Sequence, residues 1–131
     1  MRAVNDGAEG TRYPDVEFVV TPERVAAFRD VFGHAEGVPP TFLTAAEFTA
    51  LPQVVGDPGL ALDFSRVLHG GQEYELMRPP REGETLTVRA RIDSIRIRGG
   101  TGFLVIAMDM LDRAGELVAR SRSTMIERTV A

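Results

Sequence analysis

Residues 41–50 read TFLTAAEFTA, a run with the composition of a helix but without the single apolar stripe of a surface helix. Its apolar side chains run most of the way round the helix: Phe42, Leu43, Ala45, Ala46 and Phe48. A helix with this pattern is usually surrounded by protein. Glu47 is the exception, and we expect it to face either solvent or a polar partner. Pro52 predicts the end of the helix.

The chain after this helix predicts a series of strands joined by short turns. Apolar and polar residues alternate over 72–78 and 86–92, and the apolar phase then flips near Asp93-Ser94, which indicates a bulge. The sequence RGGT at 98–101 is typical of a hairpin. Nearly every residue of 103–111 is apolar, as expected of a central strand buried on both faces. A last strand is expected over 117–128.

The chain before the helix adds one strand and one further helix. Residues 16–20 have a short strand pattern. Thr21-Pro22-Glu23 then gives a hydroxyl cap, a first-turn proline and an early carboxylate, which together predict a helix that runs to Phe32 and stops at Gly33. Residues 52–66 contain proline and glycine with few periodic positions, and are expected to form an irregular loop.

These elements predict an α+β fold. Sequential hairpins favour an antiparallel sheet, and a curved sheet is the only large surface available to enclose residues 41–50. We therefore expect a curved antiparallel β-sheet wrapped round a central α-helix. We assign residues 1–14 to a flexible leader and residues 15–131 to a single domain.

Composition excludes several classes of function. The 131 residues contain no cysteine, which excludes a disulfide framework, a thiolate zinc site and a cysteine nucleophile. With only two histidines we expect no metal site. The formal net charge of -4 disfavours nucleic-acid binding. The N-terminus has no apolar signal-peptide core and no apolar run approaches the length of a bilayer span, so we expect a soluble cytoplasmic protein.

Two stretches resemble a known family. Residues 69–75, HGGQEYE, and 78–88, RPPREGETLTV, resemble the N-terminal, dehydratase-like domain of MaoC-type proteins. The segment PPTFL at 39–43 looks like the start of the hotdog helix in that family. The resemblance covers roughly residues 15–128.

The resemblance implies a hotdog fold and a place among (R)-specific enoyl-thioester hydratases and 3-hydroxyacyl-thioester dehydratases of fatty acid or polyketide metabolism. It also implies a dimer, an acyl chain lying near the hotdog helix, and coenzyme A or acyl carrier protein as the thioester carrier. No cofactor is implied. Within this family, the chain resembles the accessory subunit of two-subunit 3-hydroxyacyl-thioester dehydratases.

The chain departs from the family at the catalytic loop. Active members carry Gly-Asp-x-Asn-Pro-x-His after the first helix, and its aspartate and histidine act as an acid–base pair. The corresponding stretch here is FGHAEGVPP at 32–40. His34 stands where the aspartate would be, and the Asn-Pro and the motif histidine are missing. The resemblance therefore supports the fold more strongly than the catalysis.

The candidate site residues follow from these two regions. His34 could act as a base with Glu36 steering it, although His34 could equally be a polar residue at a helix terminus. The helix start at Pro40, Thr41 and Phe42 could aim free N–H groups at a thioester carbonyl.

The second candidate region is the start of the HGGQEYE stretch. Gly70 and Gly71 could let backbone N–H groups approach a ligand beside His69, and the alternative is that His69 packs at the strand entrance and bonds a loop carbonyl. The series Arg89, Arg91, Arg96 and Arg98 is most simply the solvated side of a strand; a carrier-phosphate site is the alternative.

Three functions remain open on the sequence. The first is a hydratase/dehydratase, acting alone through His34 or, preferably, as one subunit that shapes the pocket for a catalytic MaoC-like partner. The second is a non-catalytic acyl-thioester-binding or scaffold module. The third is an acyl-thioesterase with Glu47 as its carboxylate. Because a small curved sheet has exposed edges, we expect a homodimer or a heterodimer.

Overall fold

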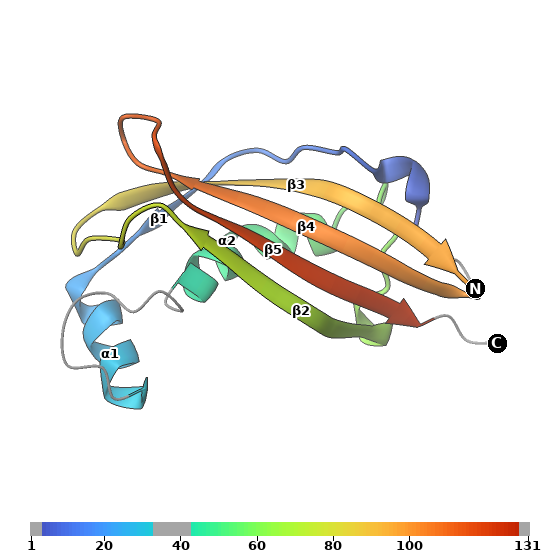
Figure 1. Cartoon of the computed structure of the whole chain (residues 1–131), viewed down its shortest axis with the longest axis horizontal. Helices are drawn as coiled ribbons and strands as arrows, with labels where there is room; N and C mark the ends of the chain where they lie inside the picture. The colour runs from blue at the N-terminus through green and yellow to red at the C-terminus, as the bar shows by residue number, and fades with distance from the viewer. Residues whose placement is uncertain (1–3, 33–42, 129–131) are drawn as a thin grey trace.

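The computed structural model describes residues 4–32 and 43–128 (Figure 1). Its elements follow one another as two groups, first mainly helical and then stranded. In chain order they are η1 (Asp6–Ala8), β1 (Val16–Val19), α1 (Pro22–Phe32), α2 (Leu43–Val55), η3 (Phe64–Arg66), β2 (Val67–Leu76), β3 (Thr85–Arg98), β4 (Thr101–Leu111) and β5 (Leu117–Arg128).

The strands form one antiparallel sheet in the order β1-β3-β4-β5-β2. The expected hairpin between the strands on either side of residues 77–84 does not form, because β2 pairs with β5 and not with β3. The apolar strand β4 lies in the middle, as its sequence predicts. The register of β3 against β4 shifts between Ile92 and Ser94, which confirms the expected bulge. Gly99 and Gly100 join these two strands with φ of 53° and 78°, values that glycine adopts without steric cost. The α+β prediction is confirmed.

Helix α2 lies behind the sheet in Figure 1 and packs against β1 and β3. Its fully buried apolar residues, Leu43, Ala46, Ala50 and Val54, fall on one stripe. The opposite side is open, and Phe48 is 63% exposed. Within the described residues, the expectation of a helix enclosed on all sides thus holds on one side only.

Pro52 does not end α2, contrary to the prediction. The helix runs on to Val55, and Gly56 N–H closes its last turn by donating to the Pro52 carbonyl at 2.9 Å. Proline removes one helical hydrogen bond. The side chain of Val54 is completely buried in the core, and this burial offsets the missing bond.

The start of the chain is attached along β3. Gly10 N–H donates to the Ile92 carbonyl and Tyr13 N–H to the Ala90 carbonyl, at 2.9 and 3.0 Å. Val4 is 2% exposed. The described part of the segment that we assigned to a leader is therefore packed against the domain.

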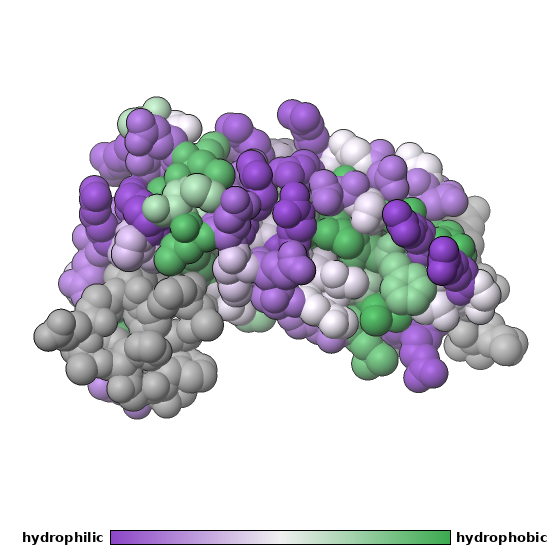
Figure 2. All heavy atoms as spheres, in the orientation of Figure 1, coloured by the Kyte–Doolittle hydropathy of each residue, from purple (hydrophilic) through white to green (hydrophobic). Residues whose placement is uncertain are grey.

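The face of the sheet turned away from α2 is largely hydrophilic (Figure 2). Asp109 of β4 pairs with Arg91 at 3.3 Å and with Arg120 at 2.7 Å, and Arg89 pairs with Asp15 at 3.0 Å. Arg96 and Arg98 are exposed. This confirms that the arginine series occupies the solvated side of β3.

Candidate functional site

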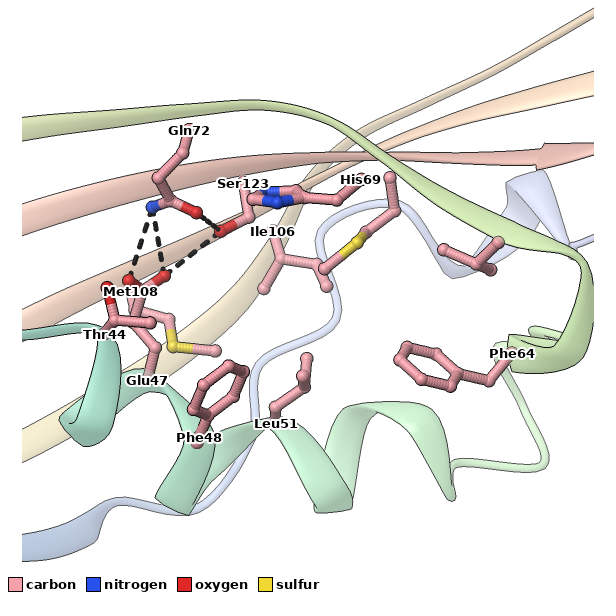
Figure 3. Close-up of a pocket in the computed structure, with 12 residues that line it drawn as sticks. Thr44, Glu47, Phe48, Leu51, Phe64, His69, Gln72, Ile106, Met108 and Ser123 are labelled. Carbon is pink, nitrogen blue, oxygen red and sulfur yellow. Dashed lines mark hydrogen bonds between the residues drawn. The ribbon is translucent and has the colours of Figure 1, made fainter.

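A cavity of about 330 Å³ lies between α2 and strands β2, β4 and β5 (Figure 3). It is divided into a polar end and an apolar end. Thr44, Glu47, Gln72 and Ser123 gather at the polar end. The remaining lining is apolar apart from His69 and consists of Phe48, Leu51, Phe64, Val67, Ile106, Met108 and Met125.

Glu47 is the centre of the polar end and is only 5% exposed. Its carboxylate accepts hydrogen bonds from four side chains. The donors are the Tyr74 hydroxyl, Gln72 Nε2 at 3.2 and 3.3 Å, Ser121 Oγ at 3.0 Å and Ser123 Oγ at 3.1 Å. Burying a carboxylate is costly unless it is hydrogen-bonded, and this group of donors meets that requirement. We call these five residues the Glu47 cluster.

The register of β2 against β5 places the donors together. Gln72 lies opposite Ser123 and Tyr74 lies opposite Ser121. Residues two apart on a strand share a face, so all four side chains project toward α2. Thr44 precedes Glu47 by three residues on that helix, and its Oγ1 lies 2.6 Å from the Tyr74 hydroxyl.

Tyr74 remains a neutral donor. Burial, followed by the hydrogen bond to Glu47, raises the pKa of the Tyr74 phenol well above its ordinary value, and the hydrogen bond with Thr44 opposes this shift. The proton therefore stays on Tyr74 near neutral pH. No buried polar side-chain atom of the described residues lacks a hydrogen-bond partner.

The apolar end of the cavity is incompletely covered. Phe48 and Phe64 are 63% and 50% exposed, although both contribute to the lining. β2, which forms one wall, is the last strand of the sheet and has no neighbour on its outer side within the described residues. An apolar lining with large exposed aromatic side chains is typical of a surface that another molecule covers.

The structure places one predicted histidine at this cavity. His69 of β2 lines it, and its ring makes no hydrogen bond with the described residues, so the alternative of a bond to a loop carbonyl is not met there. The register shifts between His69 and Gly71, which leaves Gly70 in a bulge. A Cβ at Gly70 would lie 2.6 Å from the Ile126 Cδ1 atom, so this glycine makes room for a neighbouring strand.

The other predicted site residues, His34, Glu36, Pro40, Thr41 and Phe42, lie outside the described residues. The chain enters α2 immediately after them, at Leu43. Thr44 and Glu47 therefore occupy the first turns of the helix that these residues precede.

Sequence reasoning missed Gln72, Ser121 and Ser123 as site residues. A usable signal was present, because Ser121 and Ser123 share a parity with the apolar residues Ala119 and Met125. Polar residues on a core-facing parity require a buried partner, and Glu47 on an apolar helix was the matching group.

Two further findings bear on the kind of site. Within residues 4–32 and 43–128, no three His, Cys, Asp or Glu side chains are grouped so as to hold a metal ion. None of the helices in that part of the chain is both long and apolar enough to cross a membrane.

Solved structures with the same architecture define the class of protein. A chain of the C-terminally truncated HadBC (3R-hydroxyacyl-ACP dehydratase) complex from Mycobacterium tuberculosis matches with a TM-score of 0.75 and 22% identity, covering 91% of this chain and 96% of that one. A MaoC-like dehydratase matches with a TM-score of 0.82 and 20% identity over 95% of this chain and 43% of that one. The (R)-hydratase from A. caviae has a TM-score of 0.63 at 15% identity, with coverage of 89% and 94%. At these identities the likeness shows the fold, and the predicted hotdog fold is confirmed.

Sequence comparison then gives the family. The family model described as FAS1-like, dehydratase domain region matches residues 25–121. The chain belongs to this family, and the predicted kinship with MaoC-like dehydratases is confirmed.

Curated relatives carry only the family designation UPF0336 protein. The relative from Streptomyces griseus is 39% identical over 97 residues, which are 73% of this chain and 65% of that protein. The relative from Leifsonia xyli is 30% identical with 98% of each chain covered. The chain thus spans about two thirds of the length of the Streptomyces relatives it matches.

Proposed function

We propose that the chain is the pocket-forming subunit of an (R)-specific 3-hydroxyacyl-thioester dehydratase, which also hydrates enoyl thioesters in the reverse direction. The observation that carries the proposal is the cavity along α2, with its apolar lining and its open side at Phe48 and the β2 edge. An acyl tail attached to coenzyme A or acyl carrier protein suits such a cavity, because an apolar cleft with a few placed polar groups is the usual form of a small-molecule site.

The chemistry requires groups that this chain does not bring together within the described residues. In dehydration a base removes a proton from the α-carbon, the C–O bond at the β-carbon breaks, and the oxygen leaves as water once an acid has protonated it. The titratable side chains lining the cavity are Glu47 and His69. Because four donors engage the Glu47 carboxylate, we assign the proton transfers to a MaoC-like partner that carries the Asp/His loop.

The remaining site residues take binding roles in this proposal. The backbone N–H groups of Thr41 and Phe42, just before α2, would donate to the thioester carbonyl. Pro40 has no N–H group and would only shape the start of this segment. His69 with Gly70 and Gly71 would lie along the acyl or carrier arm. His34 and Glu36 form the acid–base pair only if the chain also acts without a partner.

The exposed apolar residues support pairing with another hotdog subunit. Phe48 and Phe64 are largely exposed and line the cavity to which β2, an edge strand, also contributes, and an open strand edge is a ready site for association. The HadBC dehydratase, whose chain shares this fold, is a complex, and this supports a heterodimer with a MaoC-like subunit over a homodimer.

A binding and turnover experiment tests the proposal. Octanoyl-CoA is titrated into the purified chain by calorimetry, and hydration of crotonyl-CoA is followed with the chain alone, with a MaoC-like partner alone and with both. We expect saturable binding by the chain and turnover that rises at least tenfold when both are present. Absence of binding contradicts the proposal. Turnover by the chain alone that His34→Ala abolishes would assign the catalysis to His34.

A non-catalytic acyl-thioester-binding module is the second candidate. The engaged state of Glu47 favours it, because this carboxylate must give up hydrogen bonds before it can act as a base or nucleophile, as a thioesterase would require. Binding of octanoyl-CoA without turnover in the presence of any MaoC-like partner would establish this function. Hydrolysis that survives Glu47→Gln would exclude the thioesterase role of Glu47.

A further inference from the structure

The polar and apolar ends of the cavity suit a ligand that also has one polar and one apolar end. One end presents amide and hydroxyl groups, and the other presents hydrocarbon (Figure 3). Accepting the proposed function, we infer that Gln72 recognises a hydroxyl group on the acyl chain, and that Glu47 is the positioning residue that orients Gln72 for this contact.

The orientation of the Gln72 amide is fixed by its neighbours. Nε2 lies 3.3 and 3.2 Å from the two carboxylate oxygens of Glu47. Oε1 accepts from Ser123 Oγ at 2.6 Å, and the single proton of that hydroxyl is shared between this bond and the longer one, 3.1 Å, to Glu47. The opposite orientation would set Oε1 against a carboxylate that can only accept. The network therefore determines which end of the amide points where.

One N–H group of Gln72 is left for a ligand. The two N–H bonds of a primary amide diverge too widely for both to point at the oxygens of a single carboxylate at this range, so one hydrogen serves both contacts with Glu47. No other acceptor for Nε2 is present in the part of the chain that the structure describes. Since Gln72 lines the cavity, the second hydrogen is a donor available there.

Two members of the Glu47 cluster, Tyr74 and Ser121, contact Glu47 away from the cavity. Tyr74 and Ser121 donate to its carboxylate but do not line the cavity. Tyr74, Ser121, Ser123 and Gln72 together occupy both carboxylate oxygens of Glu47. Although Glu47 lines the cavity, its oxygens are thus engaged, and we assign it the role of orienting the Gln72 amide.

A hydroxyl suits this end of the cavity better than a group that only accepts. A hydroxyl both donates and accepts, and Thr44 Oγ1 lines the same end as an acceptor beside the Gln72 donor. The hydrocarbon beyond it would lie against Leu51, Phe64 and Met125. The chain would then run from the first turns of α2 toward Phe64, with its oxygen near the thioester end.

The test compares two thioesters that differ by one oxygen, (R)-3-hydroxyoctanoyl-CoA and octanoyl-CoA, titrated into the full chain by calorimetry. The wild-type protein should bind the hydroxylated thioester about tenfold more tightly, as one added hydrogen bond allows. Gln72→Met keeps the length of the side chain but removes the amide, and should bind the two thioesters with equal affinity.

Two further variants separate positioning from loss of structure. Glu47→Gln should also abolish the preference, and a near-ultraviolet circular dichroism spectrum like that of the wild-type protein checks that its fold is retained. Gln53→Met is the matched control, because Gln53 also lies on α2 but bonds the Pro14 carbonyl and does not line the cavity; it should retain the full preference.

The outcomes distinguish this inference from the proposed function. Equal binding of the two thioesters by the wild-type protein overturns the inference and leaves the proposed function standing. A preference that persists in Gln72→Met also overturns it. Failure to bind either thioester contradicts the proposed function, and the inference falls with it.

Discussion

Two buried glutamates on the concave side of the sheet have different kinds of partner. Glu127 of β5 is 1% exposed and accepts from two backbone N–H groups, Val4 at 2.8 Å and Asp63 at 2.7 Å. Glu47 of α2 is 5% exposed and accepts only from side chains, at the wall of a cavity. Both carboxylates are hydrogen-bonded, but Glu127 bonds the backbone and Glu47 bonds side chains.

The difference separates a structural carboxylate from one in a site. The partners of Glu127 belong to segments that are 123 and 64 residues away in sequence, so the residue ties the N-terminal segment and the loop before η3 to the end of the sheet. The partners of Glu47 are side chains that substitution can change without moving the backbone. A cluster of this second kind can be tuned to a ligand while the fold stays fixed.

The largest effect on stability should come from Glu127→Ala. It leaves one buried backbone donor, at Val4, and one partly buried donor, at Asp63, without their partner. A buried unpaired donor costs about 1–3 kcal/mol, so we expect a loss of about 3 kcal/mol in the free energy of unfolding. Urea denaturation measures it. Glu116→Ala, a change at an exposed turn residue, is the control and should shift the free energy by less than about 0.5 kcal/mol. A loss below about 1 kcal/mol for Glu127→Ala would mean that the N-terminal segment is not tied in this way.

Glu47→Gln should have the next largest effect. The amide keeps the shape but turns an N–H₂ group toward hydroxyl and amide donors, so we expect a loss of about 1–2 kcal/mol, since the donors can partly reorient. The same urea measurement applies. A loss as large as that of Glu127→Ala would show that the Glu47 cluster is structural to the same degree, and the contrast between the two glutamates would fail.

The strands could be predicted because their signals are local, but their order in the sheet could not: the short turn after β2 predicts a hairpin with β3, whereas β2 pairs with β5 at the far edge. The phase flip at Asp93-Ser94 predicts a bulge, and Gly99-Gly100 predicts a hairpin; both are confirmed. The extent of α2 could not be predicted from Pro52, because the burial of Val54 depends on a sheet formed by residues far along the chain.

The candidate site was harder to predict because its parts come from three elements. Glu47 was identified as a residue in need of a polar partner, but the partner could not be named. Gln72, Ser121 and Ser123 meet it only through the register of β2 against β5, which no local pattern fixes. Resemblance to a family directed attention to His69, which does line the cavity, and to the loop at His34, which lies outside the described residues.

A third carboxylate, Asp109, lies on the outer face of the sheet and is paired with arginine side chains. Burial opposes its ionisation, but the hydrogen bond from Arg120 and the charges of Arg91 and Arg120 outweigh this, so the pKa of Asp109 lies below its usual range. A lowered pKa in the folded state stabilises the protein above the unfolded-state pKa of about 3.9, and this contribution is lost as the pH falls through the folded-state value.

Arg120→Gln should therefore cost less than about 1 kcal/mol at pH 7, as is usual for pairs near the surface. The difference from wild type should shrink below about pH 4 as Asp109 is protonated in both proteins. Unfolding curves at pH 7 and pH 3 measure this, with Arg96→Gln on the same face as the control. A loss that is equal at both pH values would show that Arg120 acts through packing and not through charge.

The smallest change in the stability of the chain itself should come from Phe48→Ser, at the incompletely covered end of the cavity beside α2. Because Phe48 is 63% exposed, we expect a loss of no more than about 0.5 kcal/mol in the unfolding of the isolated chain. If another subunit covers this side, the same substitution should weaken the pairing, seen by light scattering, about tenfold or more, as for a buried aromatic anchor. Val19→Ser is a matched control, because Val19 is 42% exposed on β1 at the opposite edge of the sheet. Pairing that is unaffected by Phe48→Ser would place the partner elsewhere and leave the apolar end of the cavity open to solvent.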